Sequence, residues 1–185
     1  MTALPQRKIT VDEFQAWLAS LEGPERYELE AGEVVAMAPG NMQHVRTIGR
    51  LYIGLTAAIA RLGLPCEAAL DGPGVMVDEM TSYIPDVAVN CGERVPDDAR
   101  YLTNPVLVIE VLSPSTKRLD RHTKLGGYFR VPGIQHYVVI DVADRAVFHH
   151  RRGEAGLIVT AILRSGDLLL DPPGLTIPAA DLFGG

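Results

Sequence analysis

The chain is 185 residues long, within the usual range for one domain, so we expect a single folded unit over residues 1–185. Apolar residues make up 47% and charged residues 22%, a balance that excludes disorder and a fibrous repeat. The formal net charge of −6 argues against a protein that coats nucleic acid without specificity, because such binding needs many Lys and Arg side chains. A small basic cleft is compatible with this charge.

No apolar run approaches the roughly 20 residues that a membrane-spanning helix needs. The first segment, Met1 to Thr10, lacks the apolar core of a signal peptide. Cys66 and Cys91 lie in no metal-ligand spacing such as Cys-x-x-Cys. We therefore expect a cytoplasmic protein with no membrane partner and with two unpaired, structural thiols.

The predicted elements begin with a capping box. Thr10 precedes a stretch in which Glu13 takes the third helical position, which predicts a short helix over 11–21. Two short strands at 27–29 and 33–37 then flank an Ala-Gly turn and predict a hairpin.

A long amphipathic helix should follow, from Asn41 to the helix-ending Gly63. Its apolar residues recur at steps of three and four: Val45, Ile48, Leu51, Leu55, Ile59 and Leu62. Strands are then predicted at 66–70, 75–78 and 83–90. The run at 105–112 is almost continuously apolar, the pattern of a strand buried on both faces in the middle of a sheet.

The rest of the chain predicts a helix and three strands. The helix should start at Ser115 or Thr116 and reach about Arg130, and the strands are expected at 135–142, 146–151 and 157–163. His149 and His150 precede two Arg residues, which is typical of an exposed strand edge rather than of metal ligands. The tail from Asp171 is rich in Pro and Gly and should be irregular. The fold class predicted is α/β, with a central mixed β-sheet flanked by helices.

Glu110 is the one charged residue in the predicted buried strand at 105–112. Burying an ionised carboxylate without a partner is costly or forces it to bind a proton, so something must compensate it. A structural ion pair with an Arg is one explanation. The other is a metal site, in which Glu110 and Asp86, at the start of an earlier strand, share a hard cation through oxygen ligands.

An ordered series of motifs carries a resemblance to a known family. The motifs are Pro85-Asp86, Glu110-Val111-Leu112-Ser113-Pro114-Ser115, Asp120 with Lys124, and Gly133-Ile134 before Tyr137 and Asp141. Together they resemble the Uma family of putative restriction endonucleases, part of the PD-(D/E)XK nuclease superfamily. The likeness covers about residues 27–151. It implies a restriction-endonuclease-like core that hydrolyses phosphodiester bonds in DNA with Mg²⁺, for which Mn²⁺ would substitute, and it implies a homodimer.

The lysine departs from the usual superfamily pattern. There a lysine lies two residues after the second acid, where the twofold period of a strand aims both side chains at one cleft, but this chain has Leu112 at that position. The resemblance places the lysine on the next helix, at Lys124. About eight helical residues from Thr116 rise roughly 12 Å, so an antiparallel helix can return Lys124 to the level of Glu110. Asp120, one turn earlier, is expected to orient or pair with it.

The resemblance assigns the catalytic roles to Asp86, Glu110 and Lys124, and the metal ligands are expected to be Asp86, Glu110 and the backbone carbonyl of Val111. Glu28 resembles the family's first acid, and His44 resembles a histidine near the start of its long helix. Glu28 would add a water-mediated metal contact, and His44 would contact phosphate or shuttle a proton. A hairpin salt bridge and an ordinary helix-start histidine are the alternatives.

Basic residues gather on the helix predicted after Glu110. Lys117 and Arg121 are candidates for contacts to the phosphates of a nucleic acid, although a solvated helix face explains Lys117 as well. The function predicted is a metal-dependent endonuclease that hydrolyses DNA. The alternative is a catalytically inactive nuclease-like scaffold that binds nucleic acid or a protein partner, which the acidic net charge and Leu112 favour.

Overall fold

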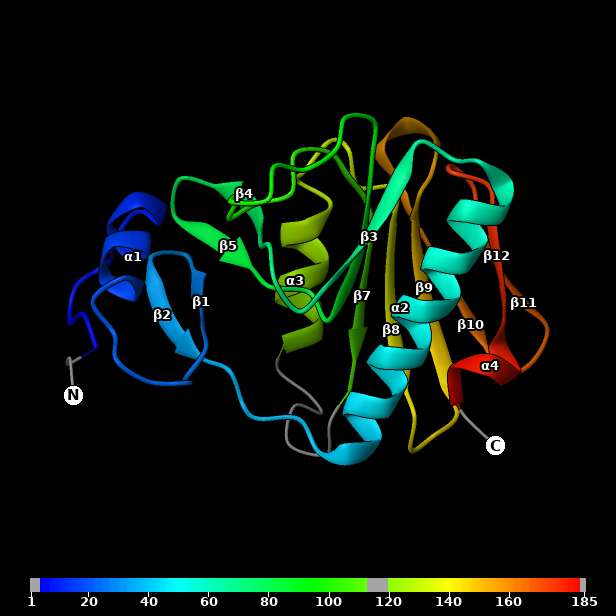
Figure 1. Cartoon of the computed structure of the whole chain (residues 1–185), viewed down its shortest axis with the longest axis horizontal. Coiled ribbons are helices and arrows are strands. Elements are labelled where there is room, and N and C mark those ends of the chain that lie inside the picture. The colour runs from blue at the N-terminus through cyan, green and yellow to red at the C-terminus, as the bar shows by residue number, and fades with distance from the viewer. Residues whose placement is uncertain (1–3, 113–119, 184–185) are drawn as a thin grey trace.

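The computed structural model describes residues 4–112 and 120–183, with the side chains of residues 120–122 outside that description. Its largest element is a six-stranded mixed sheet in the order β10-β9-β8-β7-β6-β3 (Figure 1). The strands are β3 (Cys66–Leu70), β6 (Val87–Cys91), β7 (Pro105–Val111), β8 (His136–Asp141), β9 (Ala146–Arg152) and β10 (Ile158–Leu163). Strands β7 and β8 pair in parallel and the other neighbours are antiparallel. The predicted mixed sheet is confirmed.

Strand β7 lies inside this sheet, between β6 and β8. Six of its seven residues are buried, and the seventh, Glu110, is partly buried. The prediction of a central strand buried on both faces is confirmed. Its side chains alternate, so that Leu107 and Ile109 belong to one hydrophobic cluster and Val108 to another on the opposite face.

Two helices cover the two faces of the six-stranded sheet (Figure 1). Helix α2 spans Met42–Leu62. Asn41 caps its start, where the Asn41 side chain accepts the backbone N–H of His44, and Gly63 caps its end with a left-handed φ of 62°. Its apolar stripe, including Leu51 and Leu55, packs on the face that carries Leu107 and Ile109. Helix α3 (Asp120–Tyr128) buries Tyr128 against the other face. The predicted start of α3 at Ser115 or Thr116 falls outside the described residues.

A second, four-stranded antiparallel sheet stands beside the first, in the order β2-β1-β5-β4. Its strands are β1 (Tyr27–Glu30), β2 (Glu33–Ala36), β4 (Val75–Asp78) and β5 (Thr81–Tyr83). The hairpin expected from the sequence is confirmed as β1 and β2. Helix α1 (Val11–Leu18) packs on this sheet through Phe14 and begins with the predicted capping box.

One strand prediction is wrong in a way that matters for the site. The single strand expected at 83–90 is two strands in two different sheets, because β5 ends at Tyr83 and β6 begins at Val87. Pro85 lies in the break, and proline has no N–H with which to continue a ladder. The chain therefore crosses from the small sheet to the large one at residues 84–86, which puts Asp86 at the junction.

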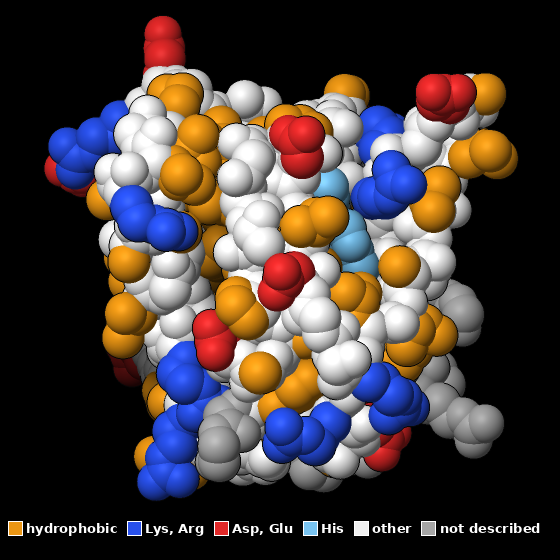
Figure 2. All heavy atoms as spheres, turned by 90° about the vertical axis from the view of Figure 1, so that its right-hand side faces the viewer, with side chains coloured by type: hydrophobic (Ala, Val, Ile, Leu, Met, Phe, Trp, Pro, Cys, Tyr) orange, Lys and Arg blue, Asp and Glu red, His pale blue; other side chains and the backbone are white. Residues whose placement is uncertain are grey.

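The C-terminal segment is regular rather than irregular, contrary to the prediction from its Pro and Gly content. Strands β11 (Asp167–Leu170) and β12 (Leu175–Pro178) form a hairpin, and helix α4 (Ala179–Phe183) follows. Alternate apolar residues such as Leu168 and Leu170 are buried against the α2 side of the sheet. Figure 2 shows one face of the molecule, on which apolar side chains are exposed among Lys and Arg. Ile53 on α2 and Leu169 on β11 are among the exposed large apolar residues.

The expectation of two unpaired cysteines is wrong. Cys66 and Cys91 form a disulfide, because β3 and β6 place them directly opposite each other in an antiparallel register. Residues 25 positions apart thus meet through strand pairing, which their spacing in the chain does not reveal. In the described part of the chain, no helix is long and apolar enough to cross a membrane.

The histidines at the predicted strand edge are also placed differently. Strand β9 lies between β8 and β10, so it is not an edge, and His149 is buried. His149 Nε2 lies 2.9 Å from His136 Nδ1, and His136 Nε2 lies 2.9 Å from the carbonyl oxygen of Pro172. Because a carbonyl only accepts, His136 donates through Nε2 and, when neutral, accepts from His149 at Nδ1. Burial lowers the pKa of both rings, and that of His149 falls to about 4.

This pair predicts that the protein loses stability as the pH falls. The folded pKa of His149 is about 4 against an ordinary 6.5, so protonation favours the unfolded chain. The stabilisation from neutral His149 is complete above pH 6.5 and is lost as the pH falls toward 4. Between about pH 8 and pH 5 the free energy of unfolding should fall by roughly 2 kcal/mol. Urea unfolding across this range should show a smaller slope for His149→Gln, which can still donate to His136.

His150→Gln is the matched control, because it removes the next imidazole along β9 and leaves the hydrogen bond between His136 and His149 in place. An identical pH slope in wild type and His149→Gln would contradict the assignment.

Candidate active site

The junction between the two sheets brings the predicted acids together. In the antiparallel pairing of β6 with β7, Val87 lies opposite Ile109 and Ala88 opposite Val108. One further step along this register puts Asp86 opposite Glu110, and directly opposed residues point to the same face of a sheet. The two acids lie 24 residues apart in the chain. The predicted convergence of these acids is what the register produces.

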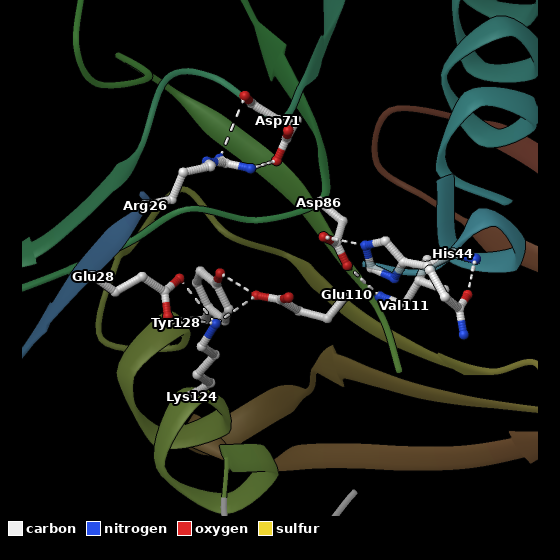
Figure 3. Close-up of polar contacts among 10 residues, drawn as sticks. Arg26, Glu28, His44, Asp71, Asp86, Glu110, Val111, Lys124 and Tyr128 are labelled. Carbon is white, nitrogen blue, oxygen red and sulfur yellow. Dashed lines mark hydrogen bonds and ion pairs between the residues drawn. The ribbon is translucent and has the colours of Figure 1, made fainter. Parts of the chain in front are cut away.

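Asp86 is buried and has two partners on the large-sheet side of the junction. Its Oδ2 accepts the backbone N–H of Val111 at 2.7 Å, and its Oδ1 lies 3.2 Å from Nε2 of His44 (Figure 3). His44 is in the first turn of α2, so that helix delivers an imidazole to the acid. The hydrogen bond to Asp86 raises the pKa of His44, although burial opposes the shift. His44 Nδ1 is buried and has no hydrogen-bond partner in the described structure.

Lys124 is buried and projects from α3 toward two carboxylates (Figure 3). Its Nζ lies 2.9 Å from Glu28 and 3.1 Å from Oε1 of Glu110. Helix α3 therefore does bring the lysine to the level of Glu110, whereas the predicted helical turn from Thr116 falls outside the described residues. Glu28 also accepts the backbone N–H of Ile84 at 2.7 Å, so it ties the lysine to the segment that joins the two sheets.

Two tyrosines that the sequence did not single out complete this cluster. The hydroxyl of Tyr128 donates to Oε1 of Glu110 at 2.8 Å, and Lys124 Nζ lies 5.5 Å from the centre of the Tyr83 ring. Burial and the negative charge of Glu110 raise the pKa of Tyr128 well above its usual value, so its hydroxyl stays a donor. The signal for Tyr128 was its position four residues after Lys124, which places both on one helix face.

The surroundings of Glu110 disfavour its charge. Burial raises the pKa of Glu110 to about 8, and the negative charges of Asp86 and Glu28 add to that effect. Lys124 and the Tyr128 hydroxyl act in the opposite direction. Three carboxylates thus share one lysine and one histidine. Coulomb repulsion between acids in a poorly solvated site falls when a further cation is present.

The remaining predicted site residues lie partly outside the described structure. Asp120 and Arg121 belong to α3, but their side chains are not among those described, and Lys117 precedes the described helix. Their expected roles stay predictions. Lys124 was counted in the same basic group, yet its charge is engaged by Glu28 and Glu110 inside the protein. It does not contribute to an exposed basic patch.

The donor set suits a hard divalent cation. The register of β6 and β7 puts Asp86 opposite Glu110, and Oδ2 of Asp86 accepts the backbone N–H of Val111. Oxygen ligands are the ones that Mg²⁺ prefers, and it commonly needs only one or two protein carboxylates because it keeps several waters. Across residues 4–112 and 120–183 there is no group of three or more His, Cys, Asp and Glu side chains that could enclose a metal. A cation here would depend on the two acids.

Comparison with known proteins decides the family. The family model Uma2, described as a putative restriction endonuclease, matches residues 11–180. The chain belongs to the Uma2 family. The resemblance found in the motifs around Asp86, Glu110 and Lys124 is thereby confirmed at the level of the family.

Two Synechocystis relatives extend over most of this Uma2 chain. It is 26% identical to "Uncharacterized protein slr1290" over 183 residues, covering 98% of this chain and 94% of the relative. It is 29% identical to "Uncharacterized protein sll1609" over 153 residues, covering 77% and 81%. A crystal structure of a putative nuclease belonging to DUF820 from Anabaena variabilis matches with a TM-score of 0.76 at 20% identity, over 95% of this chain and 97% of that one. This neighbour supports the restriction-endonuclease-like fold.

Removing the Lys124 charge should destabilise the protein. Lys124→Met keeps the length of the side chain but leaves Glu28 and Glu110 buried without their cation, so we expect a loss of about 3 kcal/mol in the free energy of unfolding. Urea denaturation at pH 7 measures this. The double variant Glu28→Gln/Lys124→Met should recover part of the loss, because one unpaired charge is gone. Strictly additive effects of the two substitutions would contradict the coupling.

Proposed function

We propose that this Uma2 protein is a metal-dependent endonuclease that hydrolyses phosphodiester bonds in DNA, with Mg²⁺ as its cofactor and Mn²⁺ as a substitute. The observation that carries the proposal is the register of β6 and β7, which sets Asp86 opposite Glu110 beside a buried lysine. Two acids and a lysine at one sheet junction are the groups that metal-assisted phosphoryl chemistry uses. The family and the fold of the structural neighbour agree with a nuclease.

Each residue has a distinct task in this proposal. Asp86 and Glu110, with the carbonyl of Val111, would hold the cation, which polarises the scissile phosphate and lowers the pKa of a bound water. Lys124, fixed by Glu28, would stabilise the negative charge that develops on the phosphate. His44 adds a donor beside Asp86 and is the candidate for a phosphate contact or a proton transfer.

Glu28 takes a different part from the one expected. Two of its contacts are Lys124 and the Ile84 N–H, so holding the lysine is a better explanation than a water-mediated metal contact. The hairpin salt bridge considered from the sequence is also not what these contacts form. The proposal therefore uses Glu28 to position the lysine. The phosphates flanking the scissile bond would be met by Arg121 and Lys117, as the sequence predicts.

Substitution of either acid tests the proposal. Asp86→Ala and Glu110→Ala should each abolish Mg²⁺-dependent cleavage of a DNA substrate and weaken Mn²⁺ binding in calorimetry, because each removes a ligand. Asp97→Ala is the matched control, since that exposed carboxylate pairs with Arg94. Circular dichroism and thermal unfolding check that the variants fold.

Cleavage by either acid variant at the wild-type rate would remove the assignment. Wild-type protein that binds neither Mn²⁺ nor Mg²⁺ and cleaves no DNA would instead support the alternative, a catalytically inactive scaffold that binds nucleic acid or a protein partner.

We also propose a homodimer that works in the cytoplasm. The edge strand β10 supports the dimer. Its sequence has no charge and no proline, and Ile158, Val159 and Ile162 are 40%, 39% and 62% exposed. Unprotected apolar edge strands pair readily with another chain. Antiparallel pairing of two copies of β10 would cover these side chains.

Sedimentation of wild type and Ile162→Lys tests the dimer. The wild type should sediment at twice the 20.0 kDa mass of one chain, and the added charge should shift the variant to the monomer. Leu169→Lys, at an exposed apolar position outside β10, is the control. A wild-type monomer at every concentration would overturn the dimer, and a dimeric Ile162→Lys would overturn the role of β10.

A further inference from the structure

Tyr128 makes a side-chain contact that a phenylalanine in the same place could not make. The residue is fully buried, and its hydroxyl donates to Oε1 of Glu110 at 2.8 Å. A buried hydroxyl requires a partner, but a phenylalanine of the same shape would require none. The partner here is an acid of the candidate metal site (Figure 3).

Helix α3 brings two donors to the same oxygen. Lys124 and Tyr128 are four residues apart on one helix face, and both contact Oε1 of Glu110, at 3.1 and 2.8 Å. With two donors on Oε1, the carboxylate has one preferred orientation. The second oxygen, Oε2, is then the one left for a ligand on the side of Asp86.

The ring of Tyr128 is itself held in place. Its centre lies 5.2 Å from the Tyr83 ring and 5.0 Å from the Tyr137 ring. The adjacent Gly127 permits this packing, because a Cβ at that position would lie 2.6 Å from Cε2 of Tyr83. The hydroxyl therefore has little freedom to leave Glu110.

We propose that Tyr128 is a positioning residue, whose hydroxyl fixes the rotation of the Glu110 carboxylate so that Oε2 faces the cation shared with Asp86. This inference rests on the proposed metal-dependent nuclease function. Groups that orient a metal ligand through a hydrogen bond typically change metal affinity or activity by 10–100-fold when they are removed. Tyr128 acts through Glu110 and does not touch the substrate.

Tyr128→Phe isolates the hydroxyl, because the ring and its packing remain. We expect Mn²⁺ affinity, measured by calorimetry, and kcat for DNA cleavage to fall by about 10-fold or more. The KM for DNA should stay within about twofold, because the hydroxyl contacts Glu110 and not the substrate. The melting temperature should change by only a few degrees. A crystal structure of the variant should show a rotated Glu110 carboxylate.

Tyr101→Phe is the matched control. It also removes a hydroxyl with a side-chain partner, because Gln15 donates to the Tyr101 hydroxyl at 2.6 Å, but that pair lies outside the cluster. Its Mn²⁺ affinity and kcat should equal those of the wild type. A purely structural role for Tyr128 would lower the melting temperature and leave Mn²⁺ affinity and kcat per folded molecule unchanged.

The outcomes separate the two proposals. Wild-type protein that neither binds Mn²⁺ nor cleaves DNA overturns the nuclease function and the positioning role with it. Wild-type protein that does both, beside a Tyr128→Phe variant with the same affinity and kcat, overturns the positioning role alone. A selective loss in Tyr128→Phe, absent in Tyr101→Phe, supports it.

Discussion

The interaction on which the site depends is the burial of the Lys124 ammonium between Glu28 and Glu110. Glu28 belongs to the small sheet, Glu110 to the centre of the large sheet, and Lys124 to the helix packed on that sheet. A cation in a poorly solvated place must be matched by nearby anions, so this ion pair ties three separate elements to one geometry. Glu28 also accepts the backbone N–H of Ile84, so the segment that passes from the small sheet to the large one is held at the same place.

The break at Pro85 makes this geometry possible. Because proline cannot continue a ladder, the chain leaves the small sheet and enters the large one within residues 84–86. Asp86 is then the first residue at the large sheet and faces Glu110 across the β6–β7 register. The result is an excess of carboxylate over lysine in one place, an electrostatic imbalance that a divalent cation would relieve.

Much of the fold follows from local patterns. The capping box at Thr10, the apolar steps of α2 and the apolar run of β7 each predict an element that the structure contains. Elements defined by composition alone were less predictable. The Pro- and Gly-rich tail from Asp171 forms the second strand of a hairpin and a helix, because alternate residues of that strand, Leu175 and Ile177, pack against the core even between turn-forming residues.

The sequence by itself determined which chemical groups are present and, through their order, the family. Helical and strand periodicities act between residues a few positions apart, so they can be seen along the chain. Only the tertiary structure decided the partners: Lys124 with Glu28, Tyr128 with Glu110, Cys66 with Cys91 and His136 with His149. These pairs depend on strand register and on how α3 packs, and a shift of one residue in register would turn every side chain of a strand to the other face.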